Sequence, residues 1–197
     1  MRFLMPGLAS TIIFAAFAGT AVADADWQTV SLDNNPEFTI QVPAKVGNNY
    51  VPTKNDKDQG GLMAFTVRQG DEYWGCWLSR LPYAADFSRK TAIEHLNVQA
   101  RVCQAFNPGA TNLQVMHYAR RTINGWPAAG CLFSYTVAKD RAPGGTNENL
   151  LVAAPNSAYL LLCLARTRSQ DDAQKRWPAT WAGPIQHIQQ SLHLPKK

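Results

Sequence analysis

The sequence predicts an α+β fold, a mostly antiparallel β-sheet with helices packed on it. Three observations lead to this class: several segments alternate apolar and polar residues, two segments have helical periodicity, and residues 158–165 form an unbroken apolar run. This run, AYLLLCLA, is much shorter than the roughly 20 residues that a membrane span needs. Between its polar flanks it is typical of a strand buried on both faces. Other elements should therefore cover the sheet on each side.

The first 23 residues have the pattern of a secretory signal peptide. Arg2 is followed by a weakly apolar stretch and then by Ala21-Val22-Ala23, a small-residue cleavage site. We therefore expect a signal peptide at 1–23, a single α+β domain at 24–197, and a periplasmic or secreted protein. No later stretch is long and apolar enough to suggest a membrane span.

The N-terminal part of the domain predicts a β-hairpin and a long loop. Residues 27–32 and 38–42 alternate apolar and polar side chains, and the turn-forming cluster 33–36 separates them. Pro43 ends the second strand. Residues 44–60 are polar and rich in Asn, Lys and Asp, which predicts a loop whose function the sequence leaves open.

A second hairpin and a helix follow. Residues 62–68 and 72–78 flank Gln69-Gly70-Asp71 and predict two paired strands. Ser88 is placed to cap a helix that extends to about residue 106. One buried stripe of this helix would consist of Ile93, Leu96, Ala100 and Cys103.

The next strands surround a strong turn signal. Residues 111–121 and 126–137 predict a hairpin closed by Asn124-Gly125, a pair suited to the positive φ angles of a type I′ turn. Residues 148–154 predict a strand that leads into the central apolar run. The segment 142–146 resembles a phosphate-binding loop, but a strand rather than a helix follows it, so it predicts a hairpin loop.

A last helix is predicted at about 180–194, after a polar segment that begins at residue 169. Four apolar residues with helical spacing would form its buried face, namely Trp181, Ile185, Ile188 and Leu192.

The four cysteines predict two disulfides, because even counts at wide spacing are typical of exported proteins. Three pairings are possible. We predict Cys76–Cys103 and Cys131–Cys163, since the helix carrying Cys103 should pack back near the preceding strand. The main alternative contains a Cys103–Cys131 bond.

Charge and residue spacing argue against several kinds of site. The net charge of +5 is spread along the chain, so no clustered basic face for nucleic acid is expected. His187 and His193 are six residues apart and would face different sides of a helix, so no metal site and no cofactor is predicted. Most of the six tryptophans should be core residues, although some could line a groove for a sugar or an apolar ligand.

Part of this pattern resembles a known family. The exported start, the strand at Trp27, the F-x-I-x-V-P segment at 38–43 and the order of strands and helices are similar to the PsbP-like α/β/α sandwich proteins. The resemblance implies a sheet covered on both faces. Because such proteins are mostly non-catalytic accessory or binding modules, it implies no catalytic residues.

The residues themselves favour the same function. No G-x-S-x-G motif is present, and cysteines that all pair leave no thiolate nucleophile. We expect an exported, soluble, non-catalytic accessory or binding module, not an enzyme, with an unknown protein or small-molecule partner. One alternative is an envelope hydrolase that uses His117, which alternates with Leu113 and Val115 and so should point inward, with a nearby acid. The other is a binder of a small apolar or sugar ligand.

Overall fold

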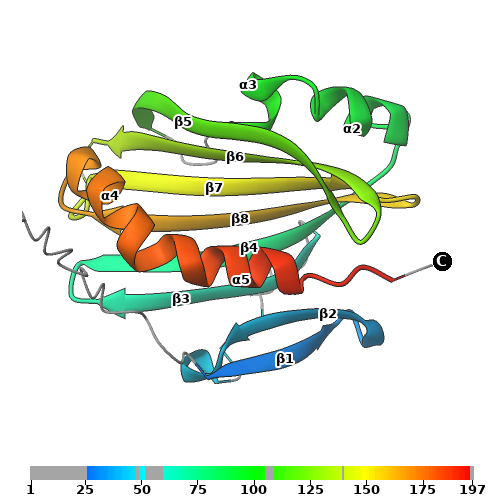
Figure 1. The fold of residues 1–197 in the computed structure, drawn as a ribbon, viewed down its shortest axis with the longest axis horizontal. Helices are drawn as coiled ribbons and strands as arrows, with labels where there is room; N and C mark the ends of the chain where they lie inside the picture. Colours follow the sequence, from blue (N-terminus) through cyan, green and yellow to red (C-terminus); the bar gives the residue numbers. More distant parts are fainter. Residues whose placement is uncertain (1–25, 48, 52–59, 105–108, 139, 196–197) are drawn as a thin grey trace, which may run out of the picture.

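A six-stranded antiparallel sheet forms the centre of the molecule, with strand order β3-β4-β8-β7-β6-β5 (Figure 1). The computed structural model describes residues 26–47, 49–51, 60–104, 109–138 and 140–195, so the expected signal peptide lies outside the described residues. The strands are β3 (Gly61–Gln69), β4 (Glu72–Pro82), β5 (Ala110–Ile123), β6 (Trp126–Val137), β7 (Gly144–Ala153) and β8 (Ser157–Thr167). A separate hairpin consists of β1 (Trp27–Leu32) and β2 (Asn35–Pro43), followed by the 3-10 turn η1 (Ala44–Val46). The predicted α+β class is confirmed.

Strand β8 contains the apolar run and lies between β4 and β7, where most of its residues are buried. After β4 the chain crosses to the far edge of the sheet and returns strand by strand from β5 to β8. The second and last strands of this sheet in the sequence, β4 and β8, are therefore neighbours. This order differs from a simple meander, and it decides which cysteines meet.

Elements on both faces cover the sheet. On one face, helix α4 (Gln170–Arg176), the π-helical turn η2 (Trp177–Trp181), helix α5 (Ala182–Ser191) and the β1–β2 hairpin enclose a core that includes Phe38, Ile40, Leu161 and Ile188. On the other face, helices α2 (Arg89–His95) and α3 (Gln99–Val102) pack over a smaller core around Leu96 and Phe133. The arrangement is the predicted sheet with helices on both sides.

The first helical region consists of two short helices, so the prediction of one helix from 88 to about 106 is wrong. Ser88 does cap α2, because its hydroxyl oxygen accepts a hydrogen bond from the Thr91 amide at 3.1 Å. Beyond α2, the Asn97 side chain donates to the Ile93 carbonyl, and Val98 is extended. A side chain that competes for backbone groups in this way favours a helix end.

The last helical region begins at Gln170, about ten residues earlier than predicted. Ser169 caps it by accepting from the Asp172 amide at 3.1 Å, and acidic residues in its first turn complement the helix dipole. The predicted apolar face is confirmed, because four residues are buried, namely Trp181, Ile185, Ile188 and Leu192.

All four cysteines form disulfides, but the predicted pairing is wrong: the bonds are Cys76–Cys163 and Cys103–Cys131. Cys76 and Cys163 are directly opposite each other in the β4–β8 register and belong to the core under α4 and α5. Cys103 belongs to the core on the other face, together with Cys131. The sheet therefore separates Cys76 from Cys103.

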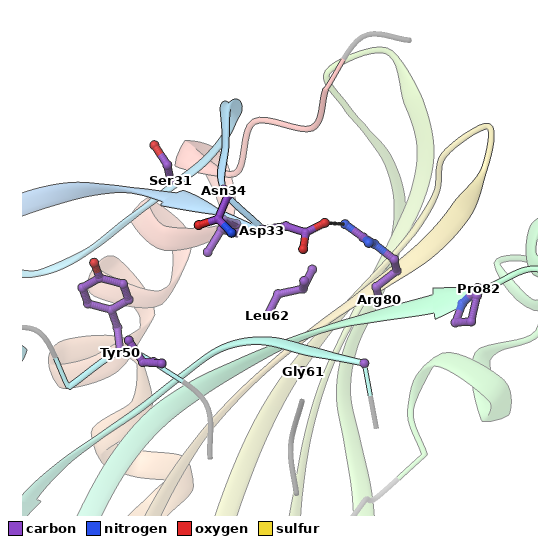
Figure 2. Close-up of a pocket in the computed structure, with 11 residues that line it drawn as sticks. Ser31, Asp33, Asn34, Tyr50, Gly61, Leu62, Arg80 and Pro82 are labelled. Atoms are coloured by element: carbon purple, nitrogen blue, oxygen red, sulfur yellow. Dashed lines mark hydrogen bonds and ion pairs between the residues drawn. The ribbon is translucent and has the colours of Figure 1, made fainter. Parts of the chain in front are cut away.

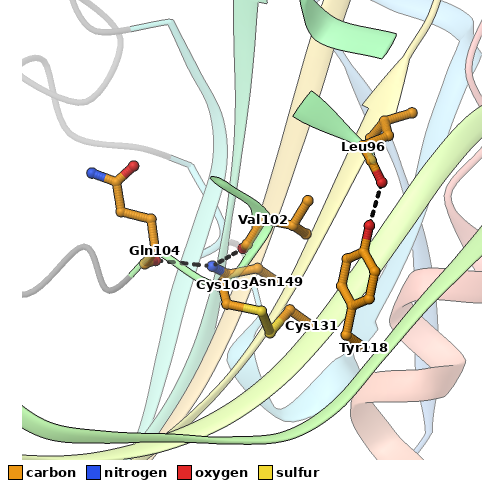
Figure 3. The surroundings of a disulfide bond; sticks show 7 residues. All are labelled: Leu96, Val102, Cys103, Gln104, Tyr118, Cys131 and Asn149. Atoms are coloured by element: carbon orange, nitrogen blue, oxygen red, sulfur yellow. Dashed lines mark hydrogen bonds between the residues drawn. A yellow bond between two sulfur atoms is a disulfide. The ribbon is translucent and has the colours of Figure 1, made fainter. Parts of the chain in front are cut away.

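The Cys103–Cys131 disulfide joins the end of α3 to β6. Side chains of β5 and β7 donate hydrogen bonds to the same segment (Figure 3). The buried Asn149 amide of β7 donates to the carbonyls of Val102 and Gln104, at 3.0 and 3.1 Å. The Tyr118 hydroxyl of β5 donates to the carbonyl of Leu96. One covalent bond and three hydrogen bonds thus attach the α2–α3 segment to this face.

Candidate functional site

A cavity of about 550 Å³ lies between the turn of the β1–β2 hairpin and the strands β3 and β4 (Figure 2). We call it the hairpin pocket. Its polar and apolar lining residues include Ser31, Asp33, Asn34, Tyr50, Leu62 and Arg80. Its volume is in the range of small-molecule sites in proteins. Tyr50 belongs to the segment that the sequence predicted as a long loop, so part of that segment contributes to the pocket.

An ion pair joins the two sides of the hairpin pocket. The Arg80 guanidinium of β4 donates to the Asp33 carboxylate at 2.7 Å, and Figure 2 shows the two side chains meeting across the cavity. Asp33 and Asn34 both have φ of 54°, as a type I′ turn requires. The turn predicted at 33–36 is thus a tight turn, and Arg80 fixes it to the sheet.

Arg80 itself is held in place from several sides. Its guanidinium carbon lies 5.9 Å from the centre of the Tyr159 ring. Burial lowers the pKa of Arg80, but the hydrogen bond from its guanidinium to Asp33 and the electrostatic influence of Tyr159 and Asp33 outweigh burial, so the net pKa is raised. The side chain is 33% exposed, so a fixed positive charge remains within reach of a ligand.

Gly60 is required where the chain approaches β4. Its φ is +81°, and an added Cβ would lie 2.3 Å from the carbonyl oxygen of Arg80. The Arg80 amide donates to the Gly60 carbonyl at 2.8 Å. Since only glycine allows both the positive φ and the close approach, the Gly60 backbone can line the pocket directly beside β4.

The hairpin pocket offers one carboxylate, one guanidinium, one phenol and an apolar wall. This set of groups can bind a small polar molecule or a side chain of a partner through charge, hydrogen bonding and apolar contact.

His117, the residue of the hydrolase alternative, is exposed on the edge strand β5. Leu113 and Val115 are also exposed, at 43% and 39%, so the prediction that this stretch points inward is wrong. All residues from 111 to 117 are exposed, so both faces of this part of the edge strand are uncovered and alternation places none of these side chains in the core. The register with β6 is also irregular between Thr111 and Gln114 and again between Val115 and His117.

The hydrolase hypothesis needs an acid near His117, and the candidate is Glu148. Its ion-pair partner, however, is Arg121. The register places His117 opposite Leu132 and Leu132 opposite Glu148, so His117 and Glu148 share a face two strands apart, about 10 Å. Arg121 approaches Glu148 to 3.5 Å and donates to Gln189 of α5 at 2.8 Å. Among the described residues, His117 has no hydrogen bond to an acid or a hydroxyl, so the geometry of a nucleophile and its base is not formed here.

The environment of Glu148 disfavours its charge. Burial raises the pKa of Glu148, and the opposing influence of Arg121, Gln189 and His117 does not cancel it. The Arg121 guanidinium has room beside Glu148 because residue 130 is glycine: an added Cβ there would lie 2.3 Å from a guanidinium nitrogen. Sequence reasoning did not find this cluster, whose members come from β5, β7 and α5.

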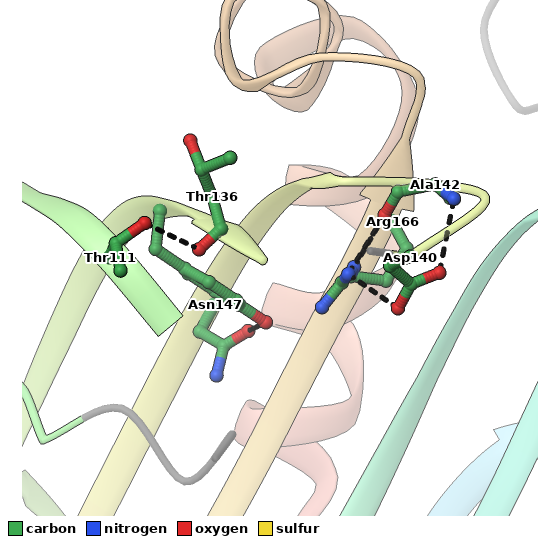
Figure 4. A network of polar contacts seen from close by, with 7 residues as sticks. Thr111, Thr136, Asp140, Ala142, Asn147 and Arg166 are labelled. Atoms are coloured by element: carbon green, nitrogen blue, oxygen red, sulfur yellow. Dashed lines mark hydrogen bonds and ion pairs between the residues drawn. The ribbon is translucent and has the colours of Figure 1, made fainter. Parts of the chain in front are cut away.

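The prediction of a hairpin loop at 142–146 is only partly right: β7 begins at Gly144, so residues 142 and 143 lie in the loop and 144–146 in the strand. A buried arginine holds this loop (Figure 4). Arg166 of β8 is 0% exposed; it donates to the Ala142 carbonyl at 2.8 and 3.0 Å and to the Asp140 carboxylate at 2.8 Å. It also lies over the Tyr135 ring at 5.6 Å. These contacts stabilise the loop from beneath.

The tryptophans are mainly structural. Trp177 and Trp181 are buried in the core, while Trp27, Trp74 and Trp126 pack against it from its periphery. Within the described part of the chain there is no cluster of three or more metal-binding side chains and no helix of the length and apolarity that crossing a membrane takes.

Comparison with known proteins gives structural matches only. No family model matches the sequence, and no curated protein matches it. A cyanobacterial PsbP (CyanoP) from Synechocystis matches with 15% identity and a TM-score of 0.47, over 89% of this chain and 96% of that one.

Two further structures match at similar levels. The Pseudomonas aeruginosa protein PA94, described as a putative regulator, has 16% identity and a TM-score of 0.45, over 86% of this chain and 99% of its own. LpqN, involved in cell envelope biogenesis of Mycobacterium tuberculosis, has 14% identity and a TM-score of 0.40, over 83% and 87%. The chain thus resembles PsbP-like proteins, as its sequence suggested, and at these identities the likeness concerns the fold alone.

Proposed function

We propose that the protein is an exported, non-catalytic accessory or binding module that accepts a ligand, or a side chain of a partner protein, in the hairpin pocket. The observation that carries the proposal is the Asp33–Arg80 pair in the wall of this pocket. The side chains of Asp33 and Arg80 are 51% and 33% exposed, so one charge of each sign is fixed in position and open to a ligand.

Export is part of the same proposal. The two disulfides support it, because structural disulfides persist mainly in oxidising compartments such as the bacterial periplasm or the extracellular space. The sequence pattern at 1–23 supports it independently. Intact-mass measurement of the exported protein tests this part: the expected chain begins at Asp24, and a chain that keeps its first 23 residues contradicts it.

Binding can be tested with a defined panel of amino acids, dipeptides and monosaccharides, followed by amide NMR shifts of the isotope-labelled protein. We expect at least one zwitterionic member to shift signals of residues 31–34, Leu62 and Arg80. Arg80→Ala and Tyr50→Ala should weaken that binding at least fivefold. Arg120→Ala, which removes an exposed arginine from β5, is the matched control and should leave it unchanged.

Two results would refute this site. One is a panel in which no member shifts signals from the pocket. The other is binding that Arg80→Ala and Tyr50→Ala leave intact while circular dichroism shows both variants folded.

The hydrolase alternative rests on one observation, the raised pKa of Glu148 on the face that also carries His117. Turnover of chromogenic esters and of peptidoglycan fragments by the wild type, His117→Ala and Glu148→Gln distinguishes it from the binding module. Turnover that both substitutions abolish would support this hydrolase, and no turnover favours the binding module. Turnover that both variants retain would exclude His117 and Glu148 as its source and would contradict a non-catalytic module.

A further inference from the structure

A second cavity lies at the opposite end of β3 and β4 from the hairpin pocket. Its volume is about 660 Å³, and we call it the arginine cleft. The cleft is surrounded by the β3–β4 turn, the loop between β6 and β7, and residues next to and within α4. The principal lining residues are Gly70, Asp71, Arg141, Ala142, Arg168 and Arg176. No sequence motif predicted this cleft, and among the described residues it has no lining residue in common with the hairpin pocket.

The three arginines of the cleft are not equally neutralised. Arg176 forms ion pairs with Glu72 at 2.8 Å and with Asp172 at 3.1 Å. Arg141 approaches Asp71 only to 4.0 Å, and both side chains are largely exposed. Arg168 is exposed and has no hydrogen bond or ion pair among the residues that the structure describes.

The carboxylates around the cleft are shared unevenly, because Glu72 and Asp172 both pair with Arg176 and only Asp71 lies near Arg141. Arg168 is left without a described partner and lines the same cleft as the weakly paired Arg141. Two such guanidinium groups suit a single carboxylate, which arginine binds in bidentate geometry. The uneven pairing thus leaves Arg168 and Arg141 available to a single carboxylate.

A smaller cavity adjoins the cleft and is mainly apolar. It has a volume of about 170 Å³ and shares Gln69, Glu72 and Arg176 with the cleft, so the two cavities meet at the Glu72–Arg176 ion pair. We call it the tryptophan pocket, since Trp74 and Trp181 line it together with Val67, Tyr73 and Pro184. An apolar cavity of about 150 Å³ is large enough for benzene, so the tryptophan pocket suits one aromatic or branched aliphatic group.

Cations hold the rings of the tryptophan pocket in place. The Arg176 guanidinium lies over Trp181 at 4.9 Å, and the Lys45 ammonium lies over Trp74 at 5.7 Å. Because Arg176 contacts Trp181 on one side and lines the cleft on the other, it couples the apolar cavity to the charged one.

We propose that the arginine cleft and the tryptophan pocket together bind a carboxylate that lies next to one hydrophobic group, the chemistry of a peptide's carboxyl end with an apolar last residue. The carboxylate binds Arg168 and Arg141, and the hydrophobic group enters the tryptophan pocket. This site is distinct from the hairpin pocket, and either can fail without the other.

The test uses matched ligands on the full protein, measured by isothermal titration calorimetry. N-acetyl-phenylalanine should bind; its amide, which lacks the charge, and N-acetylglycine, which lacks the ring, should each bind at least tenfold more weakly. Arg168→Ala should weaken binding of N-acetyl-phenylalanine at least fivefold without loss of stability, because this side chain has no described partner. Arg120→Ala should leave it unchanged.

Further ligands identify the source of the carboxylate and exclude a general anion site. If the tripeptide Ala-Ala-Phe binds more tightly than 3-phenylpropanoate, the ligand is a chain end; if 3-phenylpropanoate binds equally well, it is a free hydrophobic acid. The proposal is overturned if N-acetyl-phenylalanine fails to bind, if it binds no better than its amide, if inorganic phosphate binds equally tightly, or if Arg168→Ala has no effect.

Discussion

Cys76 and Cys163 are 87 positions apart in the sequence and form a directly opposed pair on β4 and β8, with Cα atoms 4.1 Å apart. This bond joins the first half of the sheet to its last strand. The Cys103–Cys131 bond, with a separation of 28 positions, instead attaches the α2–α3 segment to the opposite face. The two disulfides thus stabilise different parts of the fold.

Removing the two disulfides should have different costs. In the loop-entropy model, a crosslink over the longer separation contributes about 4.5 kcal/mol and one over the shorter about 3.5 kcal/mol. We expect the Cys76→Ala/Cys163→Ala double variant to lose about 1 kcal/mol more unfolding free energy than Cys103→Ala/Cys131→Ala. Urea unfolding measures both. Equal losses, or a peptide map showing Cys76–Cys103, would contradict the assignment.

Asp140 should matter for stability although it is partly exposed, because it neutralises the buried guanidinium of Arg166. Asp140→Asn keeps the shape but weakens a charge-assisted hydrogen bond, for which we expect a loss of about 1–3 kcal/mol in unfolding free energy. The control is Asp71→Asn, whose pair with Arg141 is exposed on both sides and should change stability by less than about 0.5 kcal/mol. Similar effects of the two substitutions in thermal and urea unfolding would refute this role of Asp140.

Two glycines of the sheet should respond differently to alanine. At Gly144 an added Cβ would lie 2.0 Å from the Ser169 backbone, which cannot move without shifting the start of α4. At Gly130 it meets the Arg121 guanidinium, the far end of a flexible side chain. Overpacking usually costs about 1–3 kcal/mol of unfolding free energy. We expect Gly144→Ala to lose about 3 kcal/mol or more, and Gly130→Ala to lose clearly less. Calorimetric melting of both variants tests this order. A larger loss of stability for Gly130→Ala than for Gly144→Ala would contradict the predicted contacts.

The raised pKa of Glu148 predicts a pH dependence of stability. Its folded-state pKa lies above the ordinary value of 4.5, so the folded protein binds more protons than the unfolded one just above that pH. The stabilisation is therefore complete below about pH 4.5 and is lost as the pH rises through the folded pKa, with a slope of at most about 1.4 kcal/mol per pH unit.

Glu148→Gln should remove this part of the slope. The variant should gain stability relative to the wild type as the pH rises from 4 to 7, as urea unfolding at a series of pH values would show. Glu37→Gln, at an exposed position on β2, controls for the loss of a charge. A constant difference between Glu148→Gln and the wild type across this range would exclude Glu148 as the titrating group.

Local patterns were sufficient for much of the fold. The apolar run of β8 predicted a central strand, and Asn124-Gly125 has the positive φ angles expected of its turn, 51° and 82°. The start of α4 could also have been found, because Ser169 is followed three residues later by Asp172, the signal of a capped helix.

The pairing of distant residues could not be predicted in the same way. The partner of Cys76 depends on β8 being inserted beside β4, and no local pattern specifies that strand order. The hairpin pocket depends on the same kind of information, since Asp33 and Arg80 are 47 positions apart. His117 shows a different failure: alternation of apolar and polar residues predicted a covered face, but both faces of β5 are exposed from residue 111 to 117.

The connectivity of the disulfides has a consequence for biosynthesis. Translation supplies Cys76, Cys103 and Cys131 before Cys163, so an oxidant that joins cysteines in order of appearance would first link Cys76 to Cys103. That link is not one of the two native bonds. Cys76 must therefore stay reduced until the last strand has been made, or be freed from a wrong partner by thiol exchange. The yield of native protein should thus depend on a catalyst that reshuffles disulfides as well as on one that forms them.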